Sequence, residues 1–248
     1  MTGFLTDKLR ARLNPAARQR LRRLADRFFS GLGSINGAHP PTTLVAITYD
    51  DGPDPAVTPG ILDLLKARGC RATFFVLTDK AADRPDLLQR MVAEGHEVGL
   101  HFDRHDRLTA MPKAVARERL TAARRRLEEW VGPVRFFRPP FGGQSLATFN
   151  IARKLGLDVV TWGPHAEDWI QQPPAAAAAR ALRDMRGGDI LLLHDGMEVP
   201  PGEVPPVLDR VKILDLVLDG MKDRGFVPTT VGAMVAQGRP RLSPWFRY

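Results

Sequence analysis

The sequence is poor in cysteine and has no long apolar run. Its 248 residues include one cysteine, Cys70, so an intramolecular disulfide is excluded. Basic residues interrupt the N-terminal stretch before it reaches the length of a signal-peptide core, and no later stretch approaches a bilayer span. We therefore expect a cytoplasmic protein without a disulfide framework.

The composition is otherwise that of a globular protein with an ordinary core. Hydrophobic residues make up 44% of the chain, whose length fits one large domain or two small ones. The net charge is +8, and residues 1–30 hold eight basic and two acidic residues, so six of those charges (8 − 2 = 6) fall there. The basicity therefore belongs mainly to one segment.

This N-terminal segment shows leucines at mostly helical spacing with Arg and Lys between them. Residues 5–29 are typical of a basic amphipathic helix interrupted near Pro15, and the glycine-rich stretch 31–37 before Pro40-Pro41 indicates a linker. Such a helix can hold a protein peripherally at the inner membrane surface, or it can pack on the main domain or mediate a dimer. The oligomeric state stays open, and nucleic acid is not expected because no stacking aromatics alternate with the arginines.

Strands and helices alternate beyond residue 43. Strands are predicted at 44–49, 72–77, 96–100, 134–137, 157–161, 190–193 and 226–229, and helices at 58–68, 85–94, 113–131, 145–154, 175–185 and 207–224. Seven strands in a chain of this length favour a closed parallel sheet over an open one. We predict an α/β fold, a distorted parallel (β/α) barrel with about seven strands. The predicted divisions are a basic helical segment with its linker, the barrel and a C-terminal tail, at 1–40, 41–238 and 239–248.

Two adjacent carboxylates, Asp50 and Asp51, end the first predicted strand. The Gly-Pro that follows suits a turn, but two like charges side by side also need a cation or a proton to share the site. Polar groups that perform chemistry in a parallel α/β protein gather at the carboxyl ends of the strands. The pair is therefore a candidate for a functional site.

Two histidines, His101 and His105, follow another strand. Their spacing would place both imidazoles on one face of a helical turn, within reach of one metal ion. Together with Asp51 they supply two nitrogens and one oxygen and leave a position open for water, as in catalytic zinc sites. Two His and one Asp also form the triad of non-heme iron oxygenases, in which Asp50 would have no role.

Three further strand ends carry polar or aromatic side chains. Arg138 precedes a stiff Pro-Pro turn, which suits a guanidinium held against a carboxylate. Asp168 and Trp169 follow the next strand, where an acid can orient an imidazole and an indole can wall a small pocket. A buried strand ends on His194. Five such clusters at strand ends indicate an enzyme.

These clusters form five motifs in a fixed order: YDDGP at 49–53, HxxxH at 101–105, RPPF at 138–141, DW at 168–169 and LLLH at 191–194. They resemble the motifs of the polysaccharide deacetylase family, which includes chitooligosaccharide, peptidoglycan and xylan deacetylases. The likeness spans roughly residues 44 to 230, so the N-terminal segment and the tail lie outside it.

The resemblance implies a metal-dependent deacetylase. It makes Asp50 the general base, held ionised and oriented by Arg138, and His194 the general acid, oriented by Asp168. It implies a divalent metal, zinc in the first place and otherwise cobalt, nickel or manganese, with three ligands: Asp51, His101 and His105.

The resemblance also implies an acyl pocket. Trp169 and Leu192 would line it, and the backbone N–H of Phe141 would help to hold the oxyanion. Where the family often has an Asp three residues before the DW motif, this chain has His165, which could contact the substrate, add a ligand or have no role. Phe141 stands where the family often has Tyr.

We therefore expect an enzyme that removes an N-acetyl group, or an O-acetyl group, from a sugar in an oligosaccharide or a lipid-linked glycan. Two alternatives stay open. One is a deformylase of a lipid-linked amino sugar, and the other is a catalytically silent sugar-binding protein on the same fold.

Overall fold

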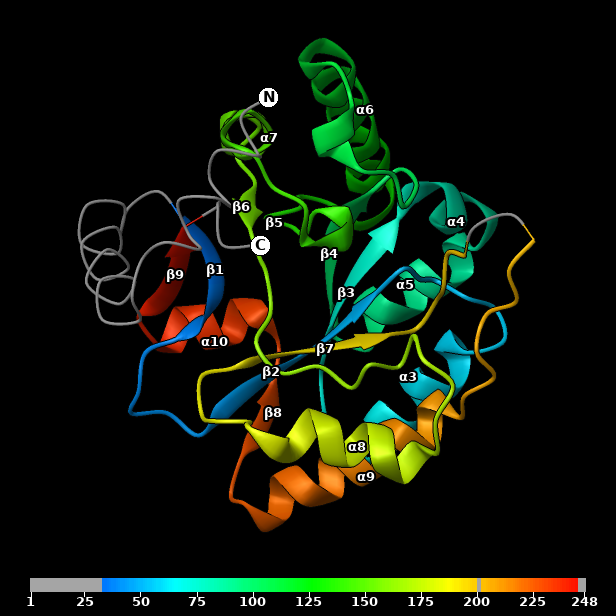
Figure 1. Cartoon of the computed structure of the whole chain (residues 1–248), viewed down its shortest axis with the longest axis vertical. Coiled ribbons are helices and arrows are strands. Elements are labelled where there is room, and N and C mark those ends of the chain that lie inside the picture. Colours follow the sequence, from blue (N-terminus) through cyan, green and yellow to red (C-terminus); the bar gives the residue numbers. More distant parts are fainter. Residues whose placement is uncertain (1–32, 200–201, 245–248) are drawn as a thin grey trace, which may run out of the picture.

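The computed structural model describes residues 33–199 and 202–244 (Figure 1). The predicted basic helix at 5–29 and the last four residues of the tail lie outside the described residues. Within them the main feature is a seven-stranded parallel sheet with the order β6-β5-β4-β3-β2-β7, in which β8 also pairs with β2. Its strands are β2 (Leu44–Asp50), β3 (Thr73–Leu77), β4 (Glu97–Phe102), β5 (Phe136–Phe137), β6 (Asp158–Val159), β7 (Ile190–His194) and β8 (Val227–Thr229).

The segment after β6 closes this sheet on itself. The Gly163 N–H donates to the Ile190 carbonyl over 2.9 Å, and the Leu192 N–H donates to the Pro164 carbonyl over 3.0 Å. His165 forms a parallel bridge with Leu192. An irregular stretch therefore joins β6 to β7 where a regular barrel would have strand pairing. The prediction of a distorted parallel (β/α) barrel with about seven strands is confirmed.

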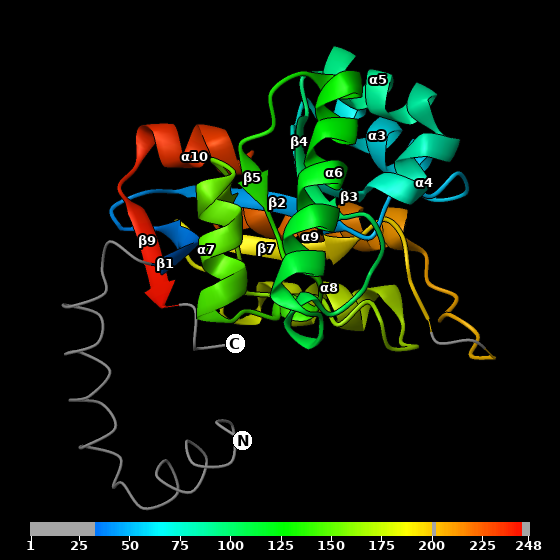
Figure 2. The same ribbon diagram turned by 90° about the horizontal axis from the view of Figure 1, so that it is seen from above.

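Helices surround the sheet (Figures 1 and 2). Proline in the first turn begins three of them, α3, α5 and α8, where its missing N–H costs no hydrogen bond. Helix α7 begins with a capping box between Ser145 and Thr148, and α9 begins after the Asp209 cap. The helices are α3 (Thr58–Ala67), α4 (Thr78–Asp83), α5 (Pro85–Ala93), α6 (Lys113–Val131), α7 (Leu146–Lys154), α8 (Pro174–Arg183), α9 (Arg210–Asp223) and α10 (Val231–Gln237). No helix among the described residues is both long and apolar enough to cross a membrane.

Successive side chains along each strand belong alternately to two apolar clusters. On β7, Leu191 and Leu193 belong to the cluster between sheet and helices, whereas Ile190 belongs to the cluster inside the barrel. Because side chains alternate along a strand, Leu192 and His194 share the inner face with Ile190. The alternation therefore brings His194 to the mouth of the barrel at the carboxyl end of the sheet.

Residues 33–38 form a strand, so the interpretation of this stretch as a linker is wrong. β1 (Gly33–Ala38) pairs antiparallel with β9 (Pro240–Pro244), so residues 240–244 of the predicted C-terminal tail also form a strand. Both strands lie beside α10 at one side of the barrel (Figure 2). The glycines permit close approach, since a Cβ added to Gly33 would lie 2.7 Å from the Ser243 carbonyl oxygen.

Candidate active site

The end of β2 carries the two adjacent carboxylates, Asp50 and Asp51, both of which are buried. Asp51 has a φ of 70°, in the left-handed region that Asp tolerates better than most residues. This turn lets successive carboxylates contact the same cluster instead of opposite faces of the sheet. No larger residue fits at Gly52, because an added Cβ would lie 2.2 Å from Asp195 Oδ2.

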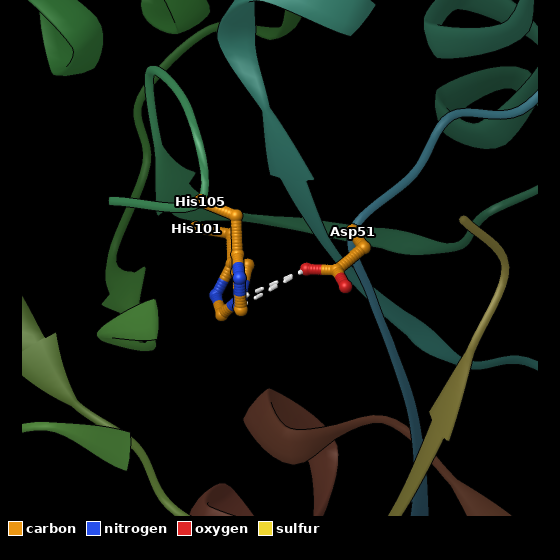
Figure 3. Close-up of side chains that lie close together, drawn as sticks. All are labelled: Asp51, His101 and His105. Carbon is orange, nitrogen blue, oxygen red and sulfur yellow. Dashed lines mark ion pairs between the residues drawn. The ribbon is translucent and has the colours of Figure 1, made fainter. Parts of the chain in front are cut away.

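Asp51, His101 and His105 form the candidate metal centre (Figure 3). Asp51 Oδ1 lies 3.3 Å from His101 Nε2 and 3.5 Å from His105 Nε2. One ligand atom from each of the three side chains lies within 4.8 Å of the other two. The structure therefore brings together all three side chains that the sequence analysis assigned to a metal.

The two histidines do not converge through a helical turn, so that part of the sequence analysis is wrong. β4 ends at Phe102, whose φ of 106° reverses the chain, and residues 103–105 form a bend. The His101 Nδ1–H donates to the Arg138 carbonyl over 2.7 Å, because a carbonyl can only accept. This tautomer leaves the Nε2 lone pair directed at the cluster.

The protonation states of the cluster suit a cation. Burial lowers the pKa of His105 to about 4, against the opposing charge of Asp51, so its imidazole is neutral near neutral pH. Burial tends to raise the pKa of Asp51, but contact with His101 and the charges of the nearby imidazoles bring it well below its usual range. Asp51 Oδ1 is buried without a hydrogen-bond partner among the described residues. An orphaned carboxylate oxygen beside two imidazoles, of which His105 is neutral near neutral pH, fits a divalent ion such as zinc.

A guanidinium from α6 holds the loop that carries these histidines. Arg119 donates from Nε and Nη2 to the two carboxylate oxygens of Asp103, each over 2.8 Å, and from Nη2 to Asp106 over 2.6 Å. Its guanidinium also lies 4.8 Å from the centre of the Phe102 ring. The loop between His101 and His105 is thereby fixed to a long helix, a contact that the sequence analysis missed.

Arg138 and Asp50 form a buried ion pair. Arg138 Nη1 donates to Asp50 Oδ1 over 2.7 Å and to Thr48 Oγ1 over 2.8 Å, and the guanidinium lies 4.1 Å from the centre of the Phe75 ring. Asp50 Oδ2 faces the candidate metal centre and lies 3.9 Å from His101 Nε2. The predicted tether is present, and Thr48 joins it although its position on β2 showed nothing unusual.

His194 and Asp168 form a second pair beside Asp50. Asp168 accepts the His194 Nδ1–H on Oδ1 and the His194 backbone N–H on Oδ2, each over 2.8 Å. Burial alone would lower the pKa of His194, but the charge and hydrogen bond of Asp168 raise it to about 9. His194 is the register partner of Asp50 on the neighbouring strand, so the two titratable groups lie side by side at the barrel mouth.

The predicted pocket residues lie around this mouth. Trp169 is 40% exposed and presents its ring edge-on to His194, with centroids 5.6 Å apart, and its ring lies 5.3 Å from His165. Phe141, 50% exposed, has its ring 4.1 Å from the His105 ring. Its φ of 59° places it in a tight turn, and its N–H has no acceptor among the described residues. Leu192 is buried on the inner face of β7.

Asp195 is a further residue that the sequence analysis missed. It is buried, its N–H donates to the Asp50 carbonyl over 3.2 Å, and Oδ2 accepts the Thr58 hydroxyl over 2.7 Å. Burial raises its pKa to about 7. Its position directly after His194 was the available signal.

Comparison with known proteins agrees with this geometry. The profile of the polysaccharide deacetylase family matches residues 37–160. A chitooligosaccharide deacetylase from Sinorhizobium fredii is 36% identical over 190 residues, covering 74% of this chain and 87% of that protein. The structure of the peptidoglycan deacetylase PdaC from Bacillus subtilis matches with a TM-score of 0.69 and 29% identity, covering 80% of this chain and 92% of that one.

A CE4 family pseudoenzyme from Bacillus anthracis shares the fold alone. Its structure matches with a TM-score of 0.75 at 22% identity, over 85% of this chain and 72% of that one. The family profile, the relative from Sinorhizobium and the barrel with its strand-end clusters agree with one another. The chain belongs to the polysaccharide deacetylase family.

Proposed function

We propose that the protein is a metal-dependent deacetylase that hydrolyses the N-acetyl group of an amino sugar within an oligosaccharide or a lipid-linked glycan. The observation that carries this proposal is that two hydrogen-bonded pairs, Arg138 with Asp50 and Asp168 with His194, lie beside the candidate metal centre. Asp50 and His194 are register partners on the neighbouring strands β2 and β7. Each pair joins a titratable group to a partner that controls its charge and orientation.

Asp51, His101 and His105 would hold a divalent cation, zinc in the first place. When bound, such an ion supplies Lewis-acid polarisation of the acyl carbonyl and makes a water more acidic. The chain contributes the preformed ligand set, since the Arg138 carbonyl fixes the tautomer of His101 and Arg119 fixes the loop before His105. A cation would also satisfy the buried Asp51 oxygen that has no hydrogen-bond partner among the described residues.

Asp50 is placed to act as the general base. Its Oδ1 is occupied by Arg138, so Oδ2, which lies on the cluster side, is the atom that accepts a proton from the attacking water. The buried guanidinium stabilises the carboxylate, and it forces the base to act through one oxygen in one orientation. Water adds to the acyl carbon as Asp50 takes its proton.

His194 is placed to act as the general acid. With its pKa raised to about 9, it is an imidazolium near neutral pH and can donate a proton to the leaving nitrogen. Asp168 holds Nδ1, so Nε2 is the atom that gives the proton up. The C–N bond breaks as the nitrogen is protonated, and the products are acetate and a free amine.

The remaining residues bind the acyl group. The Phe141 N–H, without an acceptor among the described residues, is available to the developing oxyanion, as a preorganised donor should be. Trp169, whose ring lies edge-on to His194, and Leu192, two residues before His194 on the same face of β7, offer apolar surface for the acyl methyl group.

The test is release of the acid from defined substrates. We expect the full chain, loaded with zinc or cobalt, to release acetate from N-acetylglucosamine oligomers, and Asp50→Asn to release it at least about a hundredfold more slowly. Release of formate from an N-formylated glycolipid, but no acetate from any oligomer, would favour the deformylase alternative. Sugar binding without any release by the loaded protein would favour a silent sugar-binding protein and refute the proposal.

We further propose a cytoplasmic protein whose residues 1–30 contact the inner membrane surface. The support is the net charge of +6 on this segment, although it lies outside the described residues. Because β1 belongs to the fold, the test keeps the full chain and replaces Arg18, Arg20, Arg22 and Arg23 with Gln. Equal co-sedimentation of both proteins with anionic vesicles would refute the membrane role.

A further inference from the structure

A cavity of about 540 Å³ lies beside the proposed active site, between the segment that follows β6 and the C-terminal end of α8. His165 lines it on the side of the site, and four arginines line it elsewhere: Arg180, Arg183, Arg186 and Arg241. The acidic lining residues are Glu167, Asp184 and Asp189, so cations exceed anions by one (4 − 3 = 1).

Two of the four arginines are already paired within the protein. Arg180 Nη1 lies 2.5 Å from Glu167 Oε2, and Arg241 Nη2 donates to Asp189 Oδ1 over 2.8 Å. The second oxygen of Asp189 accepts the Arg186 backbone N–H over 2.9 Å. Both oxygens of Asp189 are therefore occupied, and Glu167 is paired through Oε2 with Arg180.

Arg183 and Arg186 have no ion pair within the described residues, and neither has Asp184. Two guanidinium groups thus line a concave surface, and no carboxylate of the described residues forms an ion pair with them there. Guanidinium forks match the geometry of phosphate oxygens, with which they form paired, charge-assisted hydrogen bonds. A neighbouring cavity of about 640 Å³ is also lined by Arg186 and Arg241, so the cationic surface continues outward.

His165 joins this cavity to the catalytic residues. Its ring lies 5.3 Å from the Trp169 ring, which in turn lies 5.6 Å from that of His194. The far end of the cavity lies near Asp189, about 16 Å from His194 along the extended strand at about 3.3 Å per residue. A substrate that fills both regions would therefore be an oligosaccharide rather than a single sugar.

We propose that the arginine-lined cavity binds a phosphoryl group carried by the acylated glycan, so that the enzyme acts on an anionic oligosaccharide. This inference rests on the proposed function. The phosphoryl group can belong to a soluble glycan phosphate or to a lipid-linked glycan, since both present the same oxygens to Arg183 and Arg186.

The test compares the affinity of two ligands that differ only in phosphate. Calorimetry uses the zinc-loaded full chain carrying Asp50→Asn, with N-acetylchitotetraose and with the same oligomer bearing a reducing-end phosphate. We expect the phosphorylated oligomer to bind about tenfold more tightly, the effect of two partly exposed charge-assisted contacts. A polyprenyl diphosphate-linked oligomer in detergent micelles identifies the source: tighter binding than the soluble phosphate indicates a lipid-linked substrate, and equal binding indicates a soluble one.

Adding Arg183→Gln and Arg186→Gln should bring the ratio of the two affinities to about twofold or less. The matched control, Arg117→Gln with Arg125→Gln on α6, removes the same charge far from the cavity in the fold and should keep the preference. Equal binding of both oligomers, or a preference that survives in the cavity variant, would overturn the inference.

The same set of proteins separates this inference from the proposed function. Preferential binding of the phosphorylated oligomer, with no acetate released by the protein that retains Asp50, would refute the proposed function and support the cavity as an anion site. Acetate release together with equal affinity for both oligomers would support the proposed function and refute the anion site.

Discussion

Replacing Asp168 with Asn removes the charge beside His194 while keeping the size of the side chain and one hydrogen-bonding oxygen. In the intact protein burial opposes the imidazolium form of His194, and Asp168 more than reverses that effect, so the pKa is raised from 6.5 to about 9. In Asp168→Asn burial persists, and of the groups that oppose it only the charges of Asp51 and Asp50 remain. We therefore expect the pKa of His194 in the variant to fall from about 9 towards its usual value of 6.5.

The size of the effect follows from the two pKa values. A rise of about 2.5 pKa units corresponds to about 3 kcal/mol in favour of the imidazolium. At a pH of about 7.5 a group with a pKa of about 9 is about 97% protonated, and one with a pKa of about 6.5 is about 9% protonated, so the protonated form of His194 should become about tenfold scarcer.

The same shift affects stability, and its sign is defined. Because the folded-state pKa of His194 lies above its unfolded value, the imidazolium stabilises the fold fully below a pH of about 6.5. That contribution is lost as the pH rises through about 9. The free energy of unfolding of Asp168→Asn should therefore differ most from that of the intact protein at low pH, and the difference should shrink between these values.

The assay is the NMR titration of the histidine rings in metal-free protein, followed by the pH profile of kcat/KM with zinc. His96, which lies away from the site and whose pKa burial lowers, is the internal control and should titrate alike in both proteins. An unchanged His194 midpoint in Asp168→Asn would refute the electrostatic argument. A fall in activity with that midpoint unchanged would assign Asp168 a role in orientation alone.

Three further predictions concern the metal cluster and its supports. Asp51→Asn should no longer bind one zinc ion per chain, whereas Asp50→Asn should keep its zinc and lose about a hundredfold or more in kcat. Elemental analysis of the zinc content and kinetics check this prediction, and loss of zinc in both variants would contradict it. Gly52→Ala should lower the free energy of unfolding by about 1–3 kcal/mol, because the added Cβ would collide with the Asp195 carboxylate; an unchanged Tm would contradict the packing argument. Arg119→Met should weaken zinc binding about tenfold or more, because it removes the contacts that hold the loop between His101 and His105. An unchanged zinc affinity in calorimetry would contradict this role of Arg119.

Much of this site was predictable from local patterns. Asp50, Asp51 and His194 each lie at the end of an apolar stretch that is typical of a buried strand. The carboxyl ends of parallel strands lie at the same end of a barrel, so these side chains were expected to lie close together. The pairing of Arg138 with a carboxylate followed from a cation set between apolar residues and a stiff turn. The predicted strands reappear as β2 to β8 with boundaries shifted by a few residues.

The contacts that were not predictable join residues far apart in the chain. β1 pairs with β9 across about two hundred residues, and its glycines resemble a linker until the partner strand shows why a side chain cannot fit. His105 reaches the candidate metal centre because Phe102 adopts a positive φ, which a hydrophobic pattern in the sequence does not predict. Arg119 was one of several arginines on a long helix, and only the fold places it against Asp103 and Asp106.

Arg138 contacts the site through two different parts of one residue. Its carbonyl oxygen accepts the Nδ1 proton of His101 in the candidate metal centre, and its side chain holds Asp50, the proposed base. Asp50 and His101 are thus both hydrogen-bonded to one residue, so a shift of Arg138 relative to either strand would disturb both contacts at once. A substitution at position 138 would affect the two contacts differently. Every amino acid provides the backbone carbonyl that His101 contacts, but only arginine provides the guanidinium that Asp50 contacts. If the proposed roles hold, a relative that lacks this side chain would still bind the metal and the sugar but would no longer hydrolyse the acyl group.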